Sequence, residues 1–184
     1  MMWDLPLSVE TNGRKYFIRN KCDYRVVLDV ISALNDEELE MHQRLQCALV
    51  IFYENDVHQD DVEFVILEMF KIINLGEELD ENETPKPQVM DWKHDFNHIA
   101  PPISRVLGYS VREKNNYTHW FDFIGAYMEI GECTFSNIVS IRNKKIKGKK
   151  LEKWEQEFYR ENKKIIDLPL KLTKEEQDFL DSDW

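Results

Sequence analysis

Residues 5–19 read LPLSVETNGRKYFIR, and they predict a β-hairpin near the start of the chain. Two runs of alternating apolar and polar residues flank Asn12-Gly13. This dipeptide is the strongest short-range hairpin signal, because both residues tolerate the positive φ of a type I′ turn. An isolated two-stranded hairpin is barely stable in water. We therefore expect the hairpin to pack against helices formed by the sequence that follows.

Helical periodicity dominates the sequence after the hairpin. Apolar residues recur at helical spacing in several windows, with Asp23 as a cap before the first window and Gly76 as an end signal after the third. The expected helices cover residues 23–35, 36–52, 60–73, 90–99, 118–130, 134–141 and 151–166, with a further turn at 103–107 and a short helix near 173–180. Pro101-Pro102 is expected to stop the helix that begins at residue 90. The predicted fold class is mainly α (α+β), a helical domain of about six to seven helices with an N-terminal β-hairpin.

Composition along the chain suggests a sequential division. Residues 77–88 hold five carboxylates and two prolines, which is typical of a solvated linker. We expect residues 1–76 to form the hairpin with a three-helix subdomain, and residues 89–167 to form an aromatic and basic helical subdomain. Residues 168–184 form an acidic C-terminal tail.

The overall charge restricts the classes of partner. The 184 residues include 24 Lys and Arg against 35 Asp and Glu, which gives a net charge of −11. Binding to nucleic-acid backbones requires a basic face, so a nucleic-acid coat protein is not expected. Cys22, Cys47 and Cys133 are widely spaced, which favours free thiols in a reducing cytoplasm over a disulfide scaffold or a zinc ribbon. No signal peptide and no apolar run of ~20 residues is present, so we expect a soluble intracellular protein.

Residues 142–150, the basic segment, carry six cations and no acid. They are Arg142, Lys144, Lys145, Lys147, Lys149 and Lys150. Three interpretations remain open: an acidic protein partner or self-association, a plain solvated face, and, less favoured, nucleic-acid binding. Glu152 and the acids after it dilute the field and offer the lysines ion-pair partners.

Aromatic residues crowd the expected helix at 118–130. At helical spacing such residues more often form a core than a surface, although an exposed patch would receive a helix of another protein. Stacking of nucleic-acid bases is a further alternative.

Signals for catalysis and metal binding are weak. His94 and His98 lie four residues apart and would share one helix face, as two zinc ligands do. Asp95, however, stands where a metalloprotease has a longer glutamate, and a third ligand is not evident. No phosphate-binding glycine loop and no nucleophile motif is present. We therefore expect a non-enzymatic protein with no metal site and no cofactor.

Several stretches together are similar to one known family. They are residues 3–7 (WDLPL) with the Asn12-Gly13 turn, 90–92 (MDW), 95–96, 99–101, 105–109, 119–128, 135, 138–142 and 149–155. In this arrangement of tryptophans and basic residues, the chain up to about residue 167 resembles the bacteriophage gene-product-fifteen family of siphophages and prophages of Gram-positive bacteria. The tail from residue 168 is less typical of that family.

The resemblance implies a role in phage tail morphogenesis in the host cell cytoplasm. Genes of this family usually lie between those of the tail tube protein and the tape measure protein, where long-tailed phages encode tail assembly chaperones. The implied partners are the tape measure protein and the tail tube protein. The alternatives are a structural virion component of the tail or head–tail junction and, from another class, a nucleic-acid-binding accessory protein.

A chaperone for a long helical partner needs an apolar groove and charges that set the register. The expected partner-binding residues are Trp120, Phe121 and Tyr127, with Arg142, Lys144, Lys145, Lys147, Lys149 and Lys150 at the rim.

Overall fold

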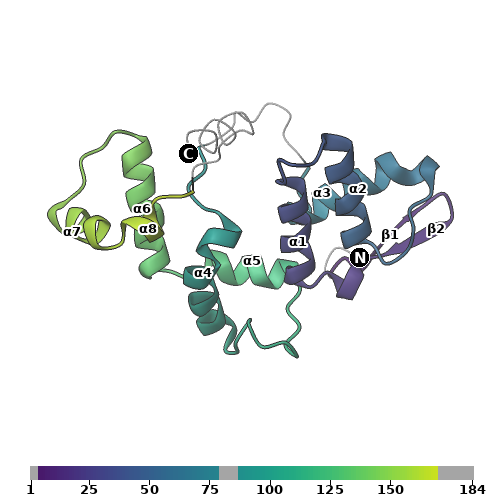
Figure 1. The fold of residues 1–184 in the computed structure, drawn as a ribbon. Helices are drawn as coiled ribbons and strands as arrows, with labels where there is room; N and C mark the ends of the chain where they lie inside the picture. The colour runs from purple at the N-terminus through teal and green to yellow at the C-terminus, as the bar shows by residue number, and fades with distance from the viewer. Residues whose placement is uncertain (1–3, 79–86, 170–184) are drawn as a thin grey trace. The chain divides into compact units, whose positions relative to one another are not determined.

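The hairpin and helices belong to a chain that divides into two compact units. The computed structural model describes residues 4–78 and 87–169. The first unit comprises Met1–Lys86 and Ile99–Gly131, and the second comprises Pro87–His98 and Glu132–Trp184. The described residues contain eight α-helices and one two-stranded antiparallel sheet (Figure 1). The predicted mainly α fold with an N-terminal hairpin is confirmed, with slightly more helices than expected.

The hairpin forms where the Asn-Gly signal predicted it. Strands β1 (Ser8–Thr11) and β2 (Arg14–Phe17) pair in antiparallel register, with Thr11 opposite Arg14 next to the turn. Asn12 and Gly13 have φ values of 48° and 73°, as a type I′ turn requires. Alternation then decides which side chains face inward, and the paired residues Val9 and Tyr16 are buried.

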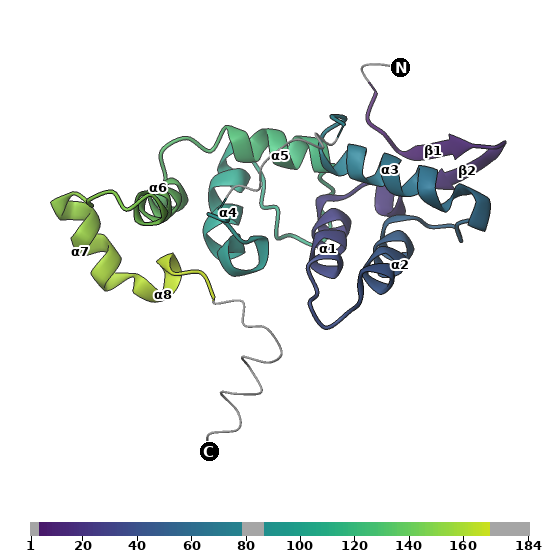
Figure 2. The ribbon, with the colours of Figure 1, turned by 90° about the horizontal axis from the view of Figure 1, so that it is seen from above.

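A buried carboxylate fixes the hairpin to the rest of the first unit. Asp61, which is fully buried, accepts hydrogen bonds from Arg14 Nε and Asn12 Nδ2 at 2.6 Å and from the Tyr16 hydroxyl at 2.5 Å. Figure 2 shows the two strands beside α3 (Val62–Ile73), which begins directly after Asp61. The hairpin therefore obtains from a helix the support that it lacks in isolation.

Helices make up the rest of the first unit. They are the 3-10 helices η1 (Arg19–Lys21) and η2 (Gln59–Asp61), α1 (Tyr24–Leu34), α2 (Met41–Phe52), α3, α5 (Trp120–Met128) and, from Ile99 on, α4 (Trp92–Leu107). Asp23 caps α1 as predicted, because its side chain accepts a hydrogen bond from Arg25 N. The acids at 36–38 predicted a helix that starts at residue 36, but α2 starts at Met41. Glu40 and Gln43 form a capping box that starts the helix, while Asp36 accepts from Glu38 N in the preceding turn.

The core of the first unit lies between these helices. Val27 and Val30 of α1 and Phe52 of α2 are completely buried. The ring of Phe123 from α5 stacks on Tyr24 with ring centroids 4.2 Å apart. Apolar burial of this kind is the main stabilising contribution to such a unit.

Helix α4 (Trp92–Leu107) continues through Pro101-Pro102, so the prediction that these prolines stop it is wrong. Each proline lacks an N–H and removes one bond of the helical ladder. Two such losses are tolerated here, and Ile99 and Ile103 around them are completely buried. The division between the two units falls inside α4, between His98 and Ile99.

The second unit is built mainly from the end of the described chain. Helices α6 (Thr134–Ile146), α7 (Lys153–Glu161) and α8 (Lys163–Ile166) surround a small core of Ile138, Ile141 and Ile166. The single helix predicted for 151–166 breaks at Asn162, which caps both α7 and α8 with ψ near 25°. Trp154, in the first turn of α7, is 48% exposed.

The unit boundaries differ from the sequential division expected from composition. Residues 99–131 return to the first unit, and 87–98 join the second, because burial follows contacts between distant segments. Most of the expected acidic linker, residues 79–86, lies outside the described residues. The same holds for residues 170–184 of the tail, including the short helix expected near 173–180.

Candidate functional site

The aromatic part of the expected partner-binding site is largely internal. Trp120 is only 3% exposed, and its indole N–H donates to the Ile73 carbonyl at 2.9 Å. Phe121 and Tyr127 are half-buried. Trp120 therefore serves as a core residue of the first unit, and the prediction that it faces a partner is corrected, because α5 directs Trp120 toward Ile73 of α3 and Phe123 toward Tyr24 of α1.

A buried histidine sets the start of α5. His119 is the N-cap, and its Nδ1 accepts a hydrogen bond from Phe121 N at 3.1 Å. Its Nε2 lies 3.4 Å from the Pro6 carbonyl. Burial disfavours the imidazolium and lowers the pKa of His119. A neutral imidazole that accepts at Nδ1 and donates at Nε2 satisfies both contacts, which indicates a structural role.

Arg142, the first cation of the basic segment, is also internal. It is 5% exposed, and it forms a bidentate pair with the fully buried Asp95 at 2.6 and 2.8 Å. Its guanidinium also donates to the carbonyls of Val89, Ile165 and Ile166. Arg142 therefore joins three segments of the second unit, and its predicted place on a binding rim is corrected. The arginine guanidinium carries five N–H donors in a planar fork, so it can bind one carboxylate and three carbonyls at once, which no other side chain can do.

The next two cations are held by acids. Lys144 Nζ lies 2.6 Å from Glu155 Oε1, and Glu155 is almost completely buried. Lys145 Nζ lies 2.5 Å from Asp167 Oδ1 and 3.9 Å from the centre of the Tyr159 ring. Burial opposes the ammonium of Lys145, but the hydrogen bonds to Asp167 and Tyr159 outweigh this effect and raise its pKa. The acids that follow the basic segment thus neutralise part of it within the chain.

The last three cations of the basic segment lie in the turn between α6 and α7, which is exposed. Gly148, with φ of 62°, ends α6 in the left-handed conformation, and Lys149 N donates to the Lys144 carbonyl at 2.8 Å. Lys147, Lys149 and Lys150 are exposed, and no acid within the described residues pairs with them. Ile146, the last residue of α6, and Trp154, in the first turn of α7, are 47% and 48% exposed. We call these five residues the basic loop surface.

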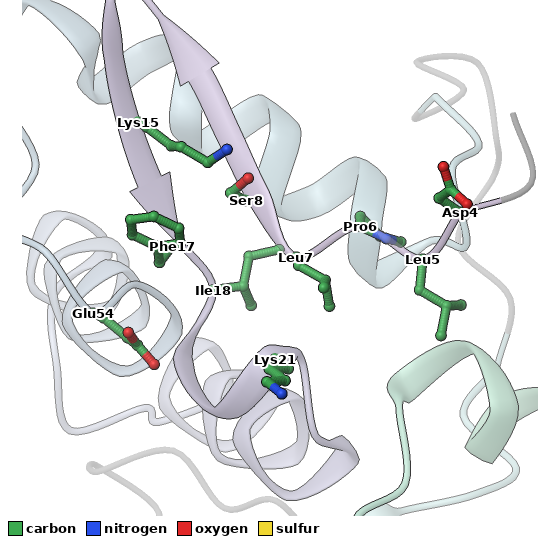
Figure 3. A pocket seen from close by; sticks show the side chains of 10 residues that line it. All are labelled: Asp4, Leu5, Pro6, Leu7, Ser8, Lys15, Phe17, Ile18, Lys21 and Glu54. Carbon is green, nitrogen blue, oxygen red and sulfur yellow. The ribbon is translucent and has the colours of Figure 1, made fainter. Parts of the chain in front are cut away.

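A second accessible feature lies at the base of the hairpin. A hollow of about 890 Å³ is lined by Asp4, Leu5, Pro6, Leu7, Ser8, Lys15, Phe17, Ile18, Lys21 and Glu54. We call it the hairpin hollow. Figure 3 shows that its lining comes from the N-terminal arm, both strands, η1 and the chain just after α2.

The hairpin hollow combines apolar surface with charges of both signs. Leu5, Leu7 and Phe17 are 41%, 44% and 46% exposed, which is unusual for three large apolar side chains around one depression. Lys15 is held by Glu10 at 2.8 Å and lies over the Phe17 ring at 5.6 Å. Such a surface can bind an apolar segment and orient it through the surrounding charges.

In the described part of the chain, one histidine of the pair and the aspartate between the two make other contacts. His94 Nε2 lies 3.2 Å from the Ile165 carbonyl, and Asp95 between the histidines is committed to Arg142. Within residues 4–78 and 87–169, no group of three His, Cys, Asp or Glu side chains is placed to hold a metal ion.

Comparison with known families gives one decisive match. The model of the family described as Bacteriophage Gp15 protein matches residues 2–168. The chain belongs to this family. No curated protein and no solved structure gave a significant match.

Membership of the Gp15 family indicates a structural or morphogenetic role in a bacteriophage. Both the hairpin hollow and the basic loop surface lie within the matched residues. The match ends at residue 168, so the acidic segment that follows lies outside it. Among the helices of the described part, none has the length and apolar character needed to cross a membrane.

Sequence reasoning missed the hairpin hollow, although one signal for it was present. Alternation along β2 places Phe17 outward once Tyr16 is inward, and Leu5 and Leu7 flank a proline at the hairpin base. The buried acids Asp61, Asp95 and Glu155 were also missed. In a chain with 35 acidic residues, nothing local distinguishes a buried carboxylate from a solvated one.

Proposed function

We propose that this Gp15-family protein is a non-enzymatic tail assembly chaperone that binds the tape measure protein of its phage through the hairpin hollow. The exposure of Leu5, Leu7 and Phe17 around one hollow is the observation that carries the proposal. Leaving three large apolar side chains in water costs free energy, which binding to an apolar partner would recover.

The chemistry of the hollow favours a helical partner that carries an apolar stripe flanked by charged residues. Lys15 and Lys21 stand on its border together with Asp4 and Glu54, so both signs of charge surround the apolar floor. A helix that places an apolar stripe on the floor would meet charges on either side, which fixes its register. Contacts of this size and polarity are also reversible, as a chaperone displaced by the tail tube requires.

The test is co-expression with the tape measure protein, followed by size-exclusion chromatography with light scattering. We expect the tape measure protein to be insoluble alone and to co-elute with the wild-type chain. Leu7→Glu combined with Phe17→Glu should weaken the complex at least about tenfold, since each substitution places a charge in the apolar contact. Met128→Glu is the matched control, because Met128 is 69% exposed in the same unit but does not line the hollow.

Other outcomes would redirect the assignment. A plain monomer that never binds the tape measure protein, yet occurs in purified particles at regular copy number, would make it a structural virion component. Retention on DNA that falls steeply with salt would favour the nucleic-acid-binding alternative. Equal loss of binding in the hollow variant and the Met128 control would remove the hollow from the proposal.

A further inference from the structure

We propose that Lys21 determines which segments the hairpin hollow accepts, by binding a carboxylate that lies beside the apolar stripe of the bound segment. The inference deepens the proposed function and rests on it. Its basis is a strained backbone turn at residues 20–22 and the pairing of the charged groups around the hollow.

Residues 20–22 form a left-handed turn at the border of the hollow. Asn20, Lys21 and Cys22 have φ values of 48°, 55° and 62°, and none of them is a glycine. Left-handed backbone brings the Cβ of an L-residue too close to the following carbonyl oxygen, so such positions are strained. Strain of this kind persists only where the surrounding structure enforces it, and it is frequent at ligand-binding sites.

Hydrogen bonds to main-chain carbonyls enforce this backbone. The Tyr117 hydroxyl donates to the Lys21 carbonyl at 2.7 Å, and Trp120 N donates to the Cys22 carbonyl at 2.9 Å. Arg19, which precedes the turn, donates to three carbonyls at the C-terminal end of α2. These contacts fix the conformation of the main chain, and they would hold a glycine at position 21 equally well.

The fold accounts for the side chains on either side of Lys21 but not for its own. Asparagine tolerates the left-handed conformation better than most residues, which explains Asn20. The Cys22 side chain is completely buried and belongs to the core. Lys21 is exposed, and among the described residues no acid pairs with it. Glycine would relieve the strain at this position, so a lysine there is explained by what its side chain binds.

The other charged groups that border the hollow already have contacts within the chain. Lys15 Nζ lies 2.8 Å from Glu10 Oε1. Glu54 Oε1 accepts a hydrogen bond at 3.3 Å from a backbone N–H of the strained turn, and Asp4 also interacts within the chain. Of the two lysines in the lining, Lys21 is therefore the one whose ammonium is available to a carboxylate from outside.

The surroundings of Lys21 define the chemistry of the bound segment. Lys21 lines the same hollow as Leu5 and Leu7, and Figure 3 shows it on the turn below Leu7. A helix that places an apolar side chain against these leucines would bring an acidic residue one turn away to the ammonium. A charge-assisted hydrogen bond beside apolar surface is stronger than one in open water. A segment with the same apolar stripe and a lysine at that place would be rejected.

Competition during co-expression tests the inference on the full chain. An affinity-tagged tape measure protein of the same phage is co-expressed with one variant and with wild-type chain that carries a short C-terminal tag. Intact mass gives the ratio of the two chains after capture and in the lysate. Lys21→Met keeps the apolar stem but removes the charge, and its capture should be about three- to tenfold lower. Lys21→Arg keeps the charge and should stay within about twofold of wild type.

Two controls separate the lysine side chain from the turn and from net charge. Asn20→Gly relieves strain in the same turn, but Asn20 does not line the hollow, so its capture should equal that of wild type. Lys114→Met removes one positive charge at an exposed site elsewhere in the same unit and should also match wild type.

The strain itself has a separate measurement that needs no partner. In the isolated chain, Lys21→Gly should raise the urea midpoint, because relief of the left-handed strain outweighs the added freedom of the unfolded chain. The same variant should lose capture as Lys21→Met does. Higher stability together with weaker binding is the signature of a residue retained for its contact with a partner.

The outcomes distinguish this inference from the function on which it rests. Absence of capture of the wild-type chain would remove both. Capture of Lys21→Met equal to wild type would overturn the role of Lys21 and leave the chaperone assignment in place. Equally poor capture of Lys21→Arg and Lys21→Met would exclude a carboxylate as the ligand. Poor capture of Asn20→Gly would assign the effect to the turn, and a lower urea midpoint in Lys21→Gly would contradict the strain.

Discussion

At the scale of single residues, buried ionic groups decide how the charged residues of this chain are used. Arg142 belongs to a run of cations that suggests a surface, yet it is 5% exposed and paired with Asp95. Removing a charge from water costs several kcal/mol, so a buried ion is tolerated only with complete hydrogen bonding. Arg142 and Asp61 both meet this condition, with partners drawn from distant segments.

The buried carboxylate of Asp61 should make the stability of the fold depend on pH. Hydrogen bonds from Arg14 and then Tyr16 hold the pKa of Asp61 well below its usual range. Because the folded pKa is lower than the unfolded value of about 3.9, Asp61 stabilises the fold above about pH 4 and this contribution is lost as the pH falls. The urea midpoint of the wild-type chain should therefore fall between about pH 5 and pH 2.

The variant Asp61→Asn should have a lower urea midpoint than the wild type at neutral pH and a smaller decrease on acidification. Asp60→Asn is the neighbouring control, because the Asp60 side chain is 74% exposed and should leave the wild-type profile intact. A full wild-type pH dependence in the Asp61 variant would contradict the assignment.

At the scale of elements, local signals and helix ends account for most of the boundaries. Asn12-Gly13 forms the hairpin turn, Asp23 caps α1, and Gly148 ends α6 with positive φ. Helix α4 shows the limit of such signals, since it continues through Pro101-Pro102. Burial of Ile99 and Ile103 outweighs the loss of two ladder bonds there.

Replacing Gly13 or Gly125 with alanine should change the free energy of unfolding in opposite directions. An added Cβ would meet nothing within 4 Å at Gly13 or at Gly125, so backbone conformation alone distinguishes them. Gly13 has φ of 73°, and Gly13→Ala should reduce the free energy of unfolding by about 1–2 kcal/mol. Gly125 lies within α5, and Gly125→Ala should raise it by about 0.5–1 kcal/mol. Urea denaturation followed by circular dichroism measures both, and changes of the same sign would contradict this account.

At the scale of the whole molecule, the chain organises into two units that each draw on separated segments. The second unit joins 87–98 to the chain from residue 132 on, and the Asp95–Arg142 pair links these two segments. All the hydrogen-bond acceptors of Arg142 lie within this unit.

We therefore expect Asp95→Ala to destabilise the second unit selectively. The substitution leaves a buried guanidinium unpaired, which costs about 3–5 kcal/mol. Hydrogen exchange read by mass spectrometry should show lost protection in α6 and α8, with α1 and α3 retained. Glu157→Ala also removes a carboxylate, but from an exposed pair 3.8 Å apart, and should change stability by less than about 1 kcal/mol. Uniform loss of protection across both units would contradict this prediction.

The sequence by itself determined the features that depend on near neighbours. The Asn12-Gly13 turn, the amphipathic helices, the Asp23 cap and the family resemblance could all be predicted, because turn geometry and helical periodicity are local properties. Only the tertiary structure decided that Trp120 and Arg142 are buried, that α4 continues through two prolines, and that an apolar hollow lies at the hairpin base. These features depend on contacts between residues dozens of positions apart, and burial at such contacts outweighs the local preference of each residue.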